Sequence, residues 1–261
     1  MSKKVSVAAM KGGVGKTLLA VCIASTLALE YDKKVLFIDT DAQANSTNYF
    51  GIDEFKKGYL SIKDALENNI NPQEIINDTY IDNLKIIGSS IYVTSLELYL
   101  FQQSGRENKI KNYIKKNEEF FEEFDYIIFD TSPSMSVVNQ NVFTATDNII
   151  VITEPSVGGA KGVDLFIDLW AGIAENLNID NKIEALILNR LVERTNIGKE
   201  FKSYLKNGEY KDIILNNMVT ESVTFKDAES YQQPINLYKP GSKYHKQIQN
   251  IVKELIERKV L

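Results

Sequence analysis

The sequence predicts an α/β fold of three layers, with helices on both faces of a mostly parallel, twisted central sheet. Short apolar runs of strand length alternate with segments of helical length along the chain. Right-handed crossovers between such strands give a parallel sheet. The chain has 261 residues, of which 44% are hydrophobic, and it shows no repeats or low-complexity linkers. One large domain over residues 1–261 is therefore expected.

A glycine-rich loop joins the first predicted strand to the first predicted helix. An apolar run at 5–9 precedes the octet Met-Lys-Gly-Gly-Val-Gly-Lys-Thr at 10–17, and an Ala- and Leu-rich segment follows at 18–29. Glycines let the backbone approach a ligand closely, and the N–H groups at a helix N-terminus attract anions. The octet therefore predicts a phosphate site, with Lys16 for the outer phosphates and the Thr17 hydroxyl for Mg²⁺. The residues assigned to this site are Gly12, Gly13, Val14, Gly15, Lys16, Thr17 and Leu18.

The octet departs from the usual phosphate-loop pattern G-x-x-x-x-G-K-[ST]. Met10 stands at the first glycine position, and Lys11 adds a second lysine. In this the octet resembles the deviant Walker A loop of the ParA/MinD family of dimerising ATPases. The resemblance implies that ATP is the nucleotide, that Lys16 is catalytic, and that Lys11 contacts ATP across a dimer. A chance Gly- and Lys-rich loop is the alternative, and the flanking strand and helix count against it.

Two aspartates follow the apolar run at 35–38, which predicts a buried parallel strand. Carboxylates at the C-terminal end of a central strand lie where α/β sheets bind ligands. The resemblance implies that Asp39 orders the phosphate loop and the Mg²⁺ shell through a water, and that Asp41 orients the attacking water. A polar turn is the alternative. Family members of the ParA type commonly have Asp-Pro-Gln-Gly-Asn here; Ala42 and Ala44 depart from it, so the flexibility of this switch is expected to differ.

The middle of the chain predicts further short elements around a second acidic strand end. Helices are expected at 61–67, 72–76, 94–103, 107–116 and 136–145, strands at 84–88 and 148–153, a glycine-rich turn at Gly158-Gly159, and a packing helix carrying Phe166, Leu169 and Trp170. A solvated acidic face is expected from Glu118, Glu119, Glu122 and Glu123. The run ending at Asp130 has the Walker B pattern, and we expect it to place Asp130 beside Thr17, holding Mg²⁺ through a water.

The next predicted strand, at 183–188, ends in Asn189-Arg190. In the MinD-like branch of the family, Asn-Arg at this strand end meets the adenine base. The resemblance therefore implies that Asn189 and Arg190 contribute to the ATP site. An ordinary turn after a strand is the alternative.

Positive charge is concentrated in the last third of the chain. Residues 182–261 carry 14 Lys and Arg against 10 Asp and Glu, a net charge of +4. Residues 1–181 carry 16 against 25, a net charge of −9, so the whole chain has a net charge of −5 although its last third is positive. The candidate DNA contacts are Lys199, Lys202, Lys206, Lys226, Lys243 and Lys246. Two arginines that the ParA family has in this region fall on Glu221 and Thr224, so the family's DNA surface is not carried over intact.

Several other classes of protein are disfavoured by the composition. The lone Cys22 allows no internal disulfide, and with the lone His245 it leaves no metal-ligand spacing and no Ser-His-Asp triad. No signal peptide or membrane span is expected. The last helix, at 244–259, allows a membrane-binding tail as in MinD, but core packing is preferred because its apolar face lacks Phe and Trp.

The predicted function is that of a Mg²⁺-dependent, slow ATPase of the ParA type. The resemblance implies an ATP-dependent homodimer, non-specific DNA binding in the ATP state, a centromere-binding ParB-like adaptor and a role in plasmid or chromosome segregation. It also implies a cytoplasmic, nucleoid-associated protein with no N-terminal helix-turn-helix domain. The alternatives are a MinD-like ATPase that positions a membrane or protein cargo and, with Lys11 counting against it, a metabolic P-loop ligase.

Overall fold

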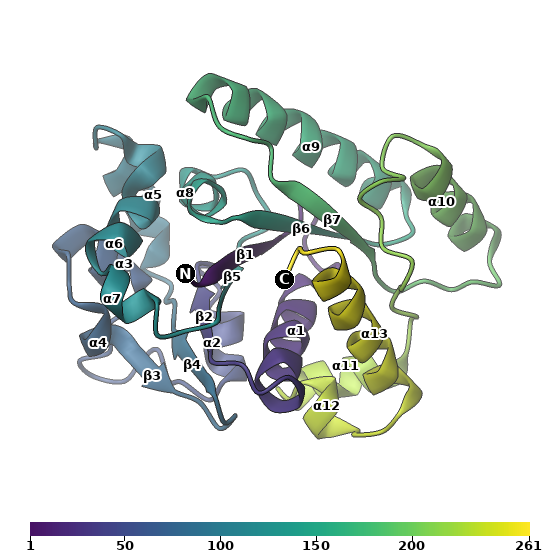
Figure 1. Cartoon of the computed structure of the whole chain (residues 1–261), viewed down its shortest axis with the longest axis horizontal. Helices are drawn as coiled ribbons and strands as arrows, with labels where there is room; N and C mark the ends of the chain where they lie inside the picture. Colours follow the sequence, from purple (N-terminus) through teal and green to yellow (C-terminus); the bar gives the residue numbers. More distant parts are fainter. The chain divides into compact units, whose positions relative to one another are not determined.

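The computed structural model describes residues 1–261 and contains a seven-stranded sheet in the order β3-β4-β2-β5-β1-β6-β7 (Figure 1). The strands are β1 (Lys3–Ala8), β2 (Val35–Asp39), β3 (Ile76–Asp78), β4 (Leu84–Ile87), β5 (Tyr126–Asp130), β6 (Asn148–Thr153) and β7 (Ile183–Leu188). β2 pairs in parallel with β4 and with β5, and β6 pairs in parallel with β7. The predicted α/β class with a mostly parallel sheet is therefore confirmed.

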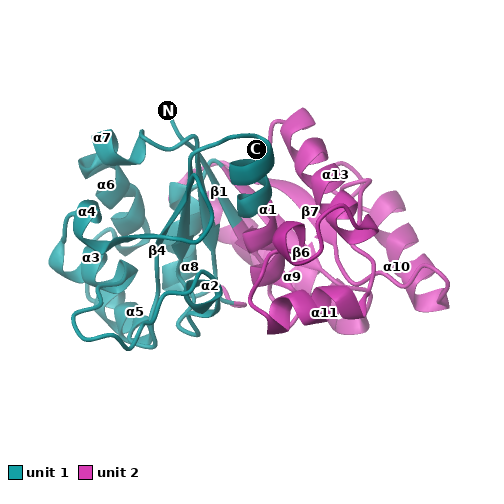
Figure 2. Cartoon of the chain, turned by 90° about the horizontal axis from the view of Figure 1, so that it is seen from below, with its two compact units in different colours: residues 1–6, 24–132, 136–147 teal, residues 7–23, 133–135, 148–261 magenta.

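The chain forms two compact units, coloured separately in Figure 2. Unit 1 comprises residues 1–6, 24–132 and 136–147, and unit 2 comprises residues 7–23, 133–135 and 148–261. The expectation of one domain over the whole chain stays a prediction. None of the helices combines the length and the apolar character needed to cross a membrane.

The central strand of unit 1, β2, is buried on both faces. All five residues of β2 are buried, as its continuous apolar run predicts. The helices of this unit are α2 (Asn45–Tyr49), α3 (Ile62–Asn68), α4 (Pro72–Ile75), α5 (Val93–Phe101), a 3₁₀ turn (Arg106–Asn108), α6 (Lys109–Lys116), α7 (Glu118–Phe121) and α8 (Val137–Ala145). The four glutamates around α7 are exposed as predicted, and Phe120 and Phe121 between them are buried.

The antiparallel strand β3 is an element that the sequence pattern did not reveal. A helix was expected through residue 76, but α4 ends at Ile75, and Ile76 adopts an extended conformation with ψ 141°. Ile76, Asn77 and Asp78 then pair antiparallel with β4. A strand of three residues is too short to show an alternating pattern, so pairing with β4 decides its conformation.

Unit 2 carries the longest helix of the chain, and its start corrects one prediction. The helices are α9 (Val157–Leu177), α10 (Asn196–Asn207), α11 (Val223–Ser230), α12 (Ile235–Tyr238) and α13 (Lys243–Glu257), and α1 (Lys16–Glu30) begins in this unit. Gly158-Gly159 is not a turn but the first turn of α9, because the Ser156 hydroxyl caps the helix by accepting from Gly159 N at 2.9 Å. A Cβ on Gly159 would collide with the carbonyl oxygen of Glu154, so close packing requires this glycine.

The long helix α9 and the last helix α13 pack through apolar side chains. The packing helix predicted to carry Phe166, Leu169 and Trp170 is α9, in which Phe166 and Trp170 are 0% exposed and Leu169 is 39% exposed. The core-packing interpretation of the last helix is confirmed, because its apolar residues are 0% exposed at Ile248, Ile251, Val252 and Leu255.

Glu254 on α13 holds the loop before α11 in place. Its carboxylate accepts hydrogen bonds from Asn216 N at 2.8 Å and Asn217 N at 2.9 Å, and Arg258 donates to it at 2.7 Å. Burial, the largest single influence, raises the pKa of Glu254, but these donors and the Arg258 charge together outweigh it and lower the pKa. The ionised form is therefore the one that stabilises the fold.

We expect Glu254→Gln to lower the free energy of unfolding by about 1–3 kcal/mol at pH 7, because buried donors lose a charged acceptor. A lowered folded-state pKa contributes stability above the unfolded-state value, about 4.3, and this contribution is lost as pH falls through the folded-state pKa. Urea unfolding at pH 7 and at low pH should therefore show the gap to the parent shrinking in acid. Glu257→Gln, at an exposed position, is the matched control, and an equal gap at both pH values would contradict this account.

Candidate functional site

The phosphate loop lies between β1 and α1 in unit 2. Gly13 and Gly15 adopt φ of +78° and +82°, a region that residues with a Cβ rarely occupy. A Cβ on Gly15 would also collide with Asn189 Nδ2, whereas one on Gly13 would meet nothing within 4 Å. Gly12 and Gly13 are exposed, and the side chain of Val14 is 1% exposed. The loop is thus anchored by the apolar side chain of Val14 and exposes Gly12 and Gly13 to solvent.

Asn189 and Arg190, predicted for the base, lie against the backbone of the phosphate loop. Asn189 follows β7, is 3% exposed, and donates from Nδ2 to the carbonyl oxygen of Val14 at 2.7 Å. The Arg190 guanidinium donates to the carbonyl oxygen of Gly13 from a residue with φ of +53°. The structure therefore brings both residues to the loop, and their contact with a base stays a prediction.

Two hollows of unit 2 border Arg190. The larger, of about 340 Å³, is lined by Glu154, Pro155, Arg190, Val192, Thr195, Ile197, Glu221 and Lys226. The smaller, of about 20 Å³, is also bordered by Gly15, Leu18 and Asn189. Space for a small polar group thus exists beside the strand end from which Asn189 and Arg190 come.

Lys11, the second lysine of the loop, is paired within its own chain. Its Nζ lies 2.5 Å from Glu154 Oε1 and 3.3 Å from Ser156 Oγ. The side chain is 39% exposed, and a Cβ added at Gly158 would lie 3.6 Å from Lys11 Cε. Lys11 therefore lies along the start of α9, within van der Waals reach of Gly158.

Glu154 is shared between two cations. Its second oxygen, Oε2, lies 3.4 Å from Arg190 NH1. The sequence around Glu154 carries no signal of this role, because an acid after a strand is common and its partners are 143 and 36 positions away. If Lys11 moved away, the Glu154 carboxylate would still face one positive charge.

The aspartates of the second and fifth strands form a buried pair in unit 1. Asp39 and Asp130 are register partners at the ends of β2 and β5, and both are 0% exposed. Burial, followed by the charge of Asp130, raises the pKa of Asp39 to about 7. A divalent cation would relieve this repulsion, and buried carboxylates are suitable ligands for Mg²⁺ or its waters.

Hydroxyl groups of α2, which the sequence analysis missed, hold both carboxylates. Ser46 Oγ donates to Asp130 Oδ2, and Thr47 Oγ1 donates to Asp39 Oδ2 at 2.7 Å. Asp41 N donates to Asp39 Oδ1 at 3.0 Å, and Asp41 itself is 8% exposed. The carboxylates of unit 1 thus supply oxygen ligands suited to Mg²⁺. The loop of unit 2 supplies backbone N–H groups suited to phosphate. The expected approach of Asp130 to Thr17 stays a prediction.

The candidate DNA lysines differ in how much free charge they offer. Lys202 pairs with Glu193 at 3.3 Å, and Lys226 pairs with Glu221 at 3.2 Å. Lys206 donates to Asn216 Oδ1 at 3.4 Å, and Lys243 Nζ lies 5.0 Å from the centre of the Tyr244 ring. Lys199 and Lys246 are exposed. Glu221 therefore neutralises one of the candidate lysines.

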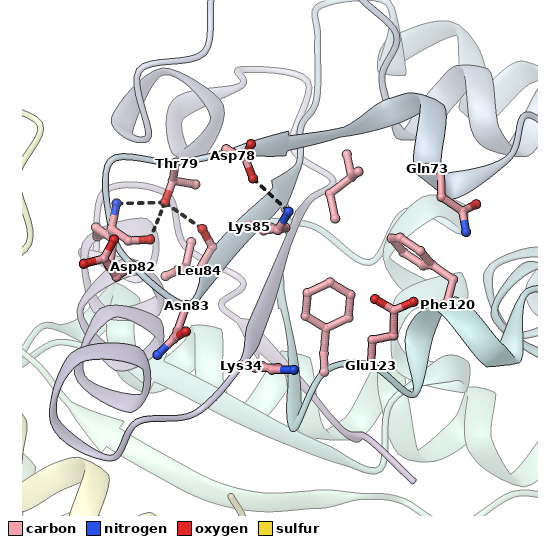
Figure 3. Close-up of a pocket in the computed structure, with 13 residues that line it drawn as sticks. Lys34, Gln73, Asp78, Thr79, Asp82, Asn83, Leu84, Lys85, Phe120 and Glu123 are labelled. Atoms are coloured by element: carbon pink, nitrogen blue, oxygen red, sulfur yellow. Dashed lines mark hydrogen bonds and ion pairs between the residues drawn. The ribbon is translucent and has the colours of Figure 1, made fainter.

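A larger hollow of unit 1 lies at the other end of its strands. It measures about 630 Å³ and is bordered by Lys34, just before β2, and by Leu84 at the start of β4 (Figure 3). Its rim carries both signs of charge, and Lys85 pairs with Asp78 at 2.8 Å. Asp39 ends β2, so this hollow is separate from the buried carboxylates.

Comparison with known proteins relates the chain to Soj and ParA. A family model described as an AAA domain matches residues 2–185. The chain is 30% identical to the sporulation initiation inhibitor protein Soj of Bacillus subtilis over 259 residues, 98% of each protein. It is 27% identical to the chromosome partitioning protein ParA of Myxococcus xanthus, covering 95% of the chain and 86% of ParA.

Solved structures agree in fold. A Borrelia burgdorferi protein assigned to plasmid partition, bound to AMPPNP, gives a TM-score of 0.82 at 24% identity, covering 99% of the chain and 100% of that protein. The Cyanothece McdA–ATP complex gives 0.86 at 21% identity over 98% and 96%. Cobyrinic acid a,c-diamide synthase of Mycobacterium smegmatis, with an ATP analogue and magnesium, gives 0.84 at 21% identity over 98% and 95%. At these identities the likeness shows the fold alone.

Proposed function

This chain belongs to the ParA/Soj family of partition ATPases, and on that premise we propose that it is an ATP-dependent dimerising ATPase. In its ATP state it binds DNA without sequence preference, and with a centromere-binding, ParB-like partner it segregates a plasmid or a chromosome. The observation that carries this proposal is a phosphate loop with a second lysine, in a chain 30% identical to Soj over nearly its whole length.

The proposed reaction is hydrolysis of ATP with Mg²⁺. The backbone N–H groups of the loop at 12–17 bind the phosphates, and Lys16 lies among them as a fixed positive charge. Mg²⁺, when bound, supplies further positive charge to the phosphate oxygens, and Thr17, Asp39 and Asp130 are the residues that would hold it. Asp41 orients the attacking water. Burial and the charge of Asp130 raise the pKa of Asp39, and a bound cation would favour its ionised form, which supports a metal site at this pair.

Dimerisation in this proposal exchanges one partner of Lys11 for another. In the single chain, Lys11 is bound to Glu154 at 2.5 Å. Closure of two subunits transfers the Lys11 ammonium to the phosphates of the partner's ATP. The Glu154 carboxylate remains 3.4 Å from Arg190 NH1, so its negative charge still has a cationic partner when Lys11 moves away.

We expect Glu154→Gln to make dimerisation easier, because it weakens the contact that competes with the partner's ATP. A partly exposed ion pair contributes about 0.5–1 kcal/mol, so the concentration of ATPγS at half-maximal dimerisation should fall about two- to fivefold. Light scattering after size exclusion, over a titration of this slowly hydrolysed analogue, measures the change. Glu193→Gln, which breaks the pair with Lys202, is the matched control. Unchanged or weaker dimerisation of Glu154→Gln would contradict the exchange.

DNA binding should depend on both nucleotide and salt. Lysine contacts to phosphate release counterions, so the logarithm of affinity should fall linearly with the logarithm of salt concentration. Fluorescence anisotropy of random-sequence duplexes with ATP measures this slope. Lys199→Gln removes one expected phosphate contact per subunit and should reduce the magnitude of the slope by about 1 per subunit. Lys115→Gln on α6 should leave the slope unchanged. Binding that ignores nucleotide, or no binding at low salt, would reject the DNA part of the proposal.

The two alternatives are tested separately. The apolar face of α13 is buried, which removes the observation that favoured a MinD-like membrane tail, so liposomes with ATP should not sediment the protein. The fold is also that of cobyrinic acid a,c-diamide synthase, so fold alone does not exclude a ligase. A small-molecule-dependent release of ADP without an ATP-driven dimer would support the ligase instead.

A further inference from the structure

We propose that Thr47 is the positioning residue for Asp39 and, through Asp39, for Asp41. The inference rests on the proposed function, which gives these two aspartates their roles in Mg²⁺ binding and hydrolysis. Asp39 Oδ2 accepts two hydrogen bonds from Thr47, one from N at 3.0 Å and one from Oγ1 at 2.7 Å. One residue of α2 thus fixes one oxygen of the carboxylate in two directions.

The direction of the Thr47 hydroxyl hydrogen is set by the chain after β4. Ser89 N donates to Thr47 Oγ1 at 2.8 Å. Since a backbone amide can only donate, the Thr47 hydroxyl accepts from Ser89, and it donates its own hydrogen to Asp39 Oδ2. Thr47 and Ser89 are both 0% exposed, so water does not offer either group a replacement partner. The hydroxyl therefore acts as an oriented donor.

Asp39 passes this orientation to Asp41. The second carboxylate oxygen of Asp39, Oδ1, accepts from Asp41 N at 3.0 Å. Asp41 Oδ1 in turn accepts from Gln43 N at 3.0 Å. If the Asp39 carboxylate rotated, the backbone at Asp41 would lose its partner, and the carboxylate that orients the water would move with it. Thr47, Asp39 and Asp41 therefore form one connected series.

The Thr47 side chain packs closely against the chain after β4. A Cβ on Gly88 would lie 2.9 Å from Thr47 Cγ2, and it would collide with the Tyr59 hydroxyl. Tyr59 donates from that hydroxyl to the carbonyl oxygen of Ser89 at 3.1 Å. Burial, followed by the charge of Asp39, raises the pKa of Tyr59, so this hydroxyl stays protonated and keeps donating. The segment after β4 is thereby held where Ser89 N meets Thr47.

The same short helix also holds the other carboxylate. Ser46, the neighbour of Thr47, donates to Asp130 Oδ2, so α2 carries one hydroxyl for each member of the buried pair. Partners that orient the ligands of a metal change metal affinity or activity about 10- to 100-fold when they are removed. Thr47 is the sharper test of the two, because it donates twice to one oxygen of Asp39 and its hydroxyl is itself held by Ser89 N.

The test compares Thr47→Val with Thr47→Ser. Valine keeps the shape but removes the hydroxyl, whereas serine keeps it. We expect Thr47→Val to raise the Mg²⁺ concentration at half-saturation of nucleotide binding about tenfold and to lower kcat at least as much. At saturating Mg²⁺ we expect the KM for ATP to stay within about twofold of the parent, because the phosphate loop is untouched. Thr47→Ser should restore both values, and Thr94→Val, which removes an exposed hydroxyl from α5, should change neither.

A purely structural role has a different signature. It would lower the melting temperature of Thr47→Val but leave its Mg²⁺ requirement and kcat per folded molecule equal to those of the parent, and that result would overturn the proposal. Should Thr47→Val not fold, Tyr59→Phe carries the test, with about a two- to threefold rise in the Mg²⁺ half-saturation expected and no change overturning it. A parent without Mg²⁺-dependent hydrolysis would refute the proposed function, while the Mg²⁺ dependence of nucleotide binding would still decide the role of Thr47.

Discussion

Asp41→Ala is expected to hold the protein in an ATP-bound dimer that hydrolyses its nucleotide at least about a hundredfold more slowly than the parent. A positioned group that activates or orients a nucleophile contributes about 10²- to 10⁴-fold. The alanine removes that group but leaves the phosphate loop, Lys16 and the Asp39–Asp130 pair in place. Binding and dimerisation should therefore persist while turnover stops.

Two measurements on one sample check the Asp41→Ala prediction. Phosphate release reports turnover, and light scattering after size exclusion reports the dimer. Asp82→Ala is the matched control and should behave as the parent. Asp82 is exposed and borders the hollow at the start of β4. Hydrolysis at the parent rate would show that Asp41 does not act on the water, and loss of the dimer would show that Asp41 is needed earlier.

Lys11→Ala should abolish both ATP-dependent dimerisation and turnover while each subunit still binds ATP. A cation supplied across an interface contributes about 10³- to 10⁵-fold to phosphoryl transfer in the best-known cases, so a loss of at least about a hundredfold is expected. Lys16 and the loop backbone remain, so ATP affinity of the single subunit should change little. Glu154 then pairs with Arg190 alone.

The Lys11→Ala prediction separates binding from assembly. Equilibrium binding of a fluorescent ATP analogue reports the single subunit, and light scattering with ATPγS reports the dimer. Lys161→Ala, an exposed lysine of α9, is the matched control. If Lys11→Ala dimerises and hydrolyses ATP as the parent does, Lys11 has no role in assembly or turnover, and the prediction is wrong.

Local patterns predicted the parts of the fold that depend on local chemistry. Continuous apolar runs identified β2, β5 and β6, because a strand buried on both faces has no polar side. The octet at 10–17 identified the phosphate loop, since positive φ at Gly13 and Gly15 and a following helix are needed together. Core packing of α13 followed from an apolar face without Phe or Trp.

Contacts between distant residues were not predicted, for physical reasons. β3 has three residues and exists because β4 pairs with it. The pair Gly158-Gly159 by itself suggests a turn. In the structure these glycines begin α9, because the Ser156 hydroxyl caps the helix and the Glu154 carbonyl leaves no room for a Cβ on Gly159. Glu154 and Thr47 matter through partners that only the fold brings near. Their residue types alone carry no signal of the contacts with Lys11 and Asp39.

The central claim, that Lys11 serves the nucleotide of the other subunit, is tested most directly by mixing two inactive variants. In a heterodimer of Lys11→Ala and Asp41→Ala, the first subunit keeps Asp41 and receives Lys11 from the second, so one site is complete. We predict that the mixture hydrolyses ATP although neither variant does so alone. If Lys11 acted within its own subunit, no site in the mixture would hold both groups, and a mixture as inactive as its components would contradict the account.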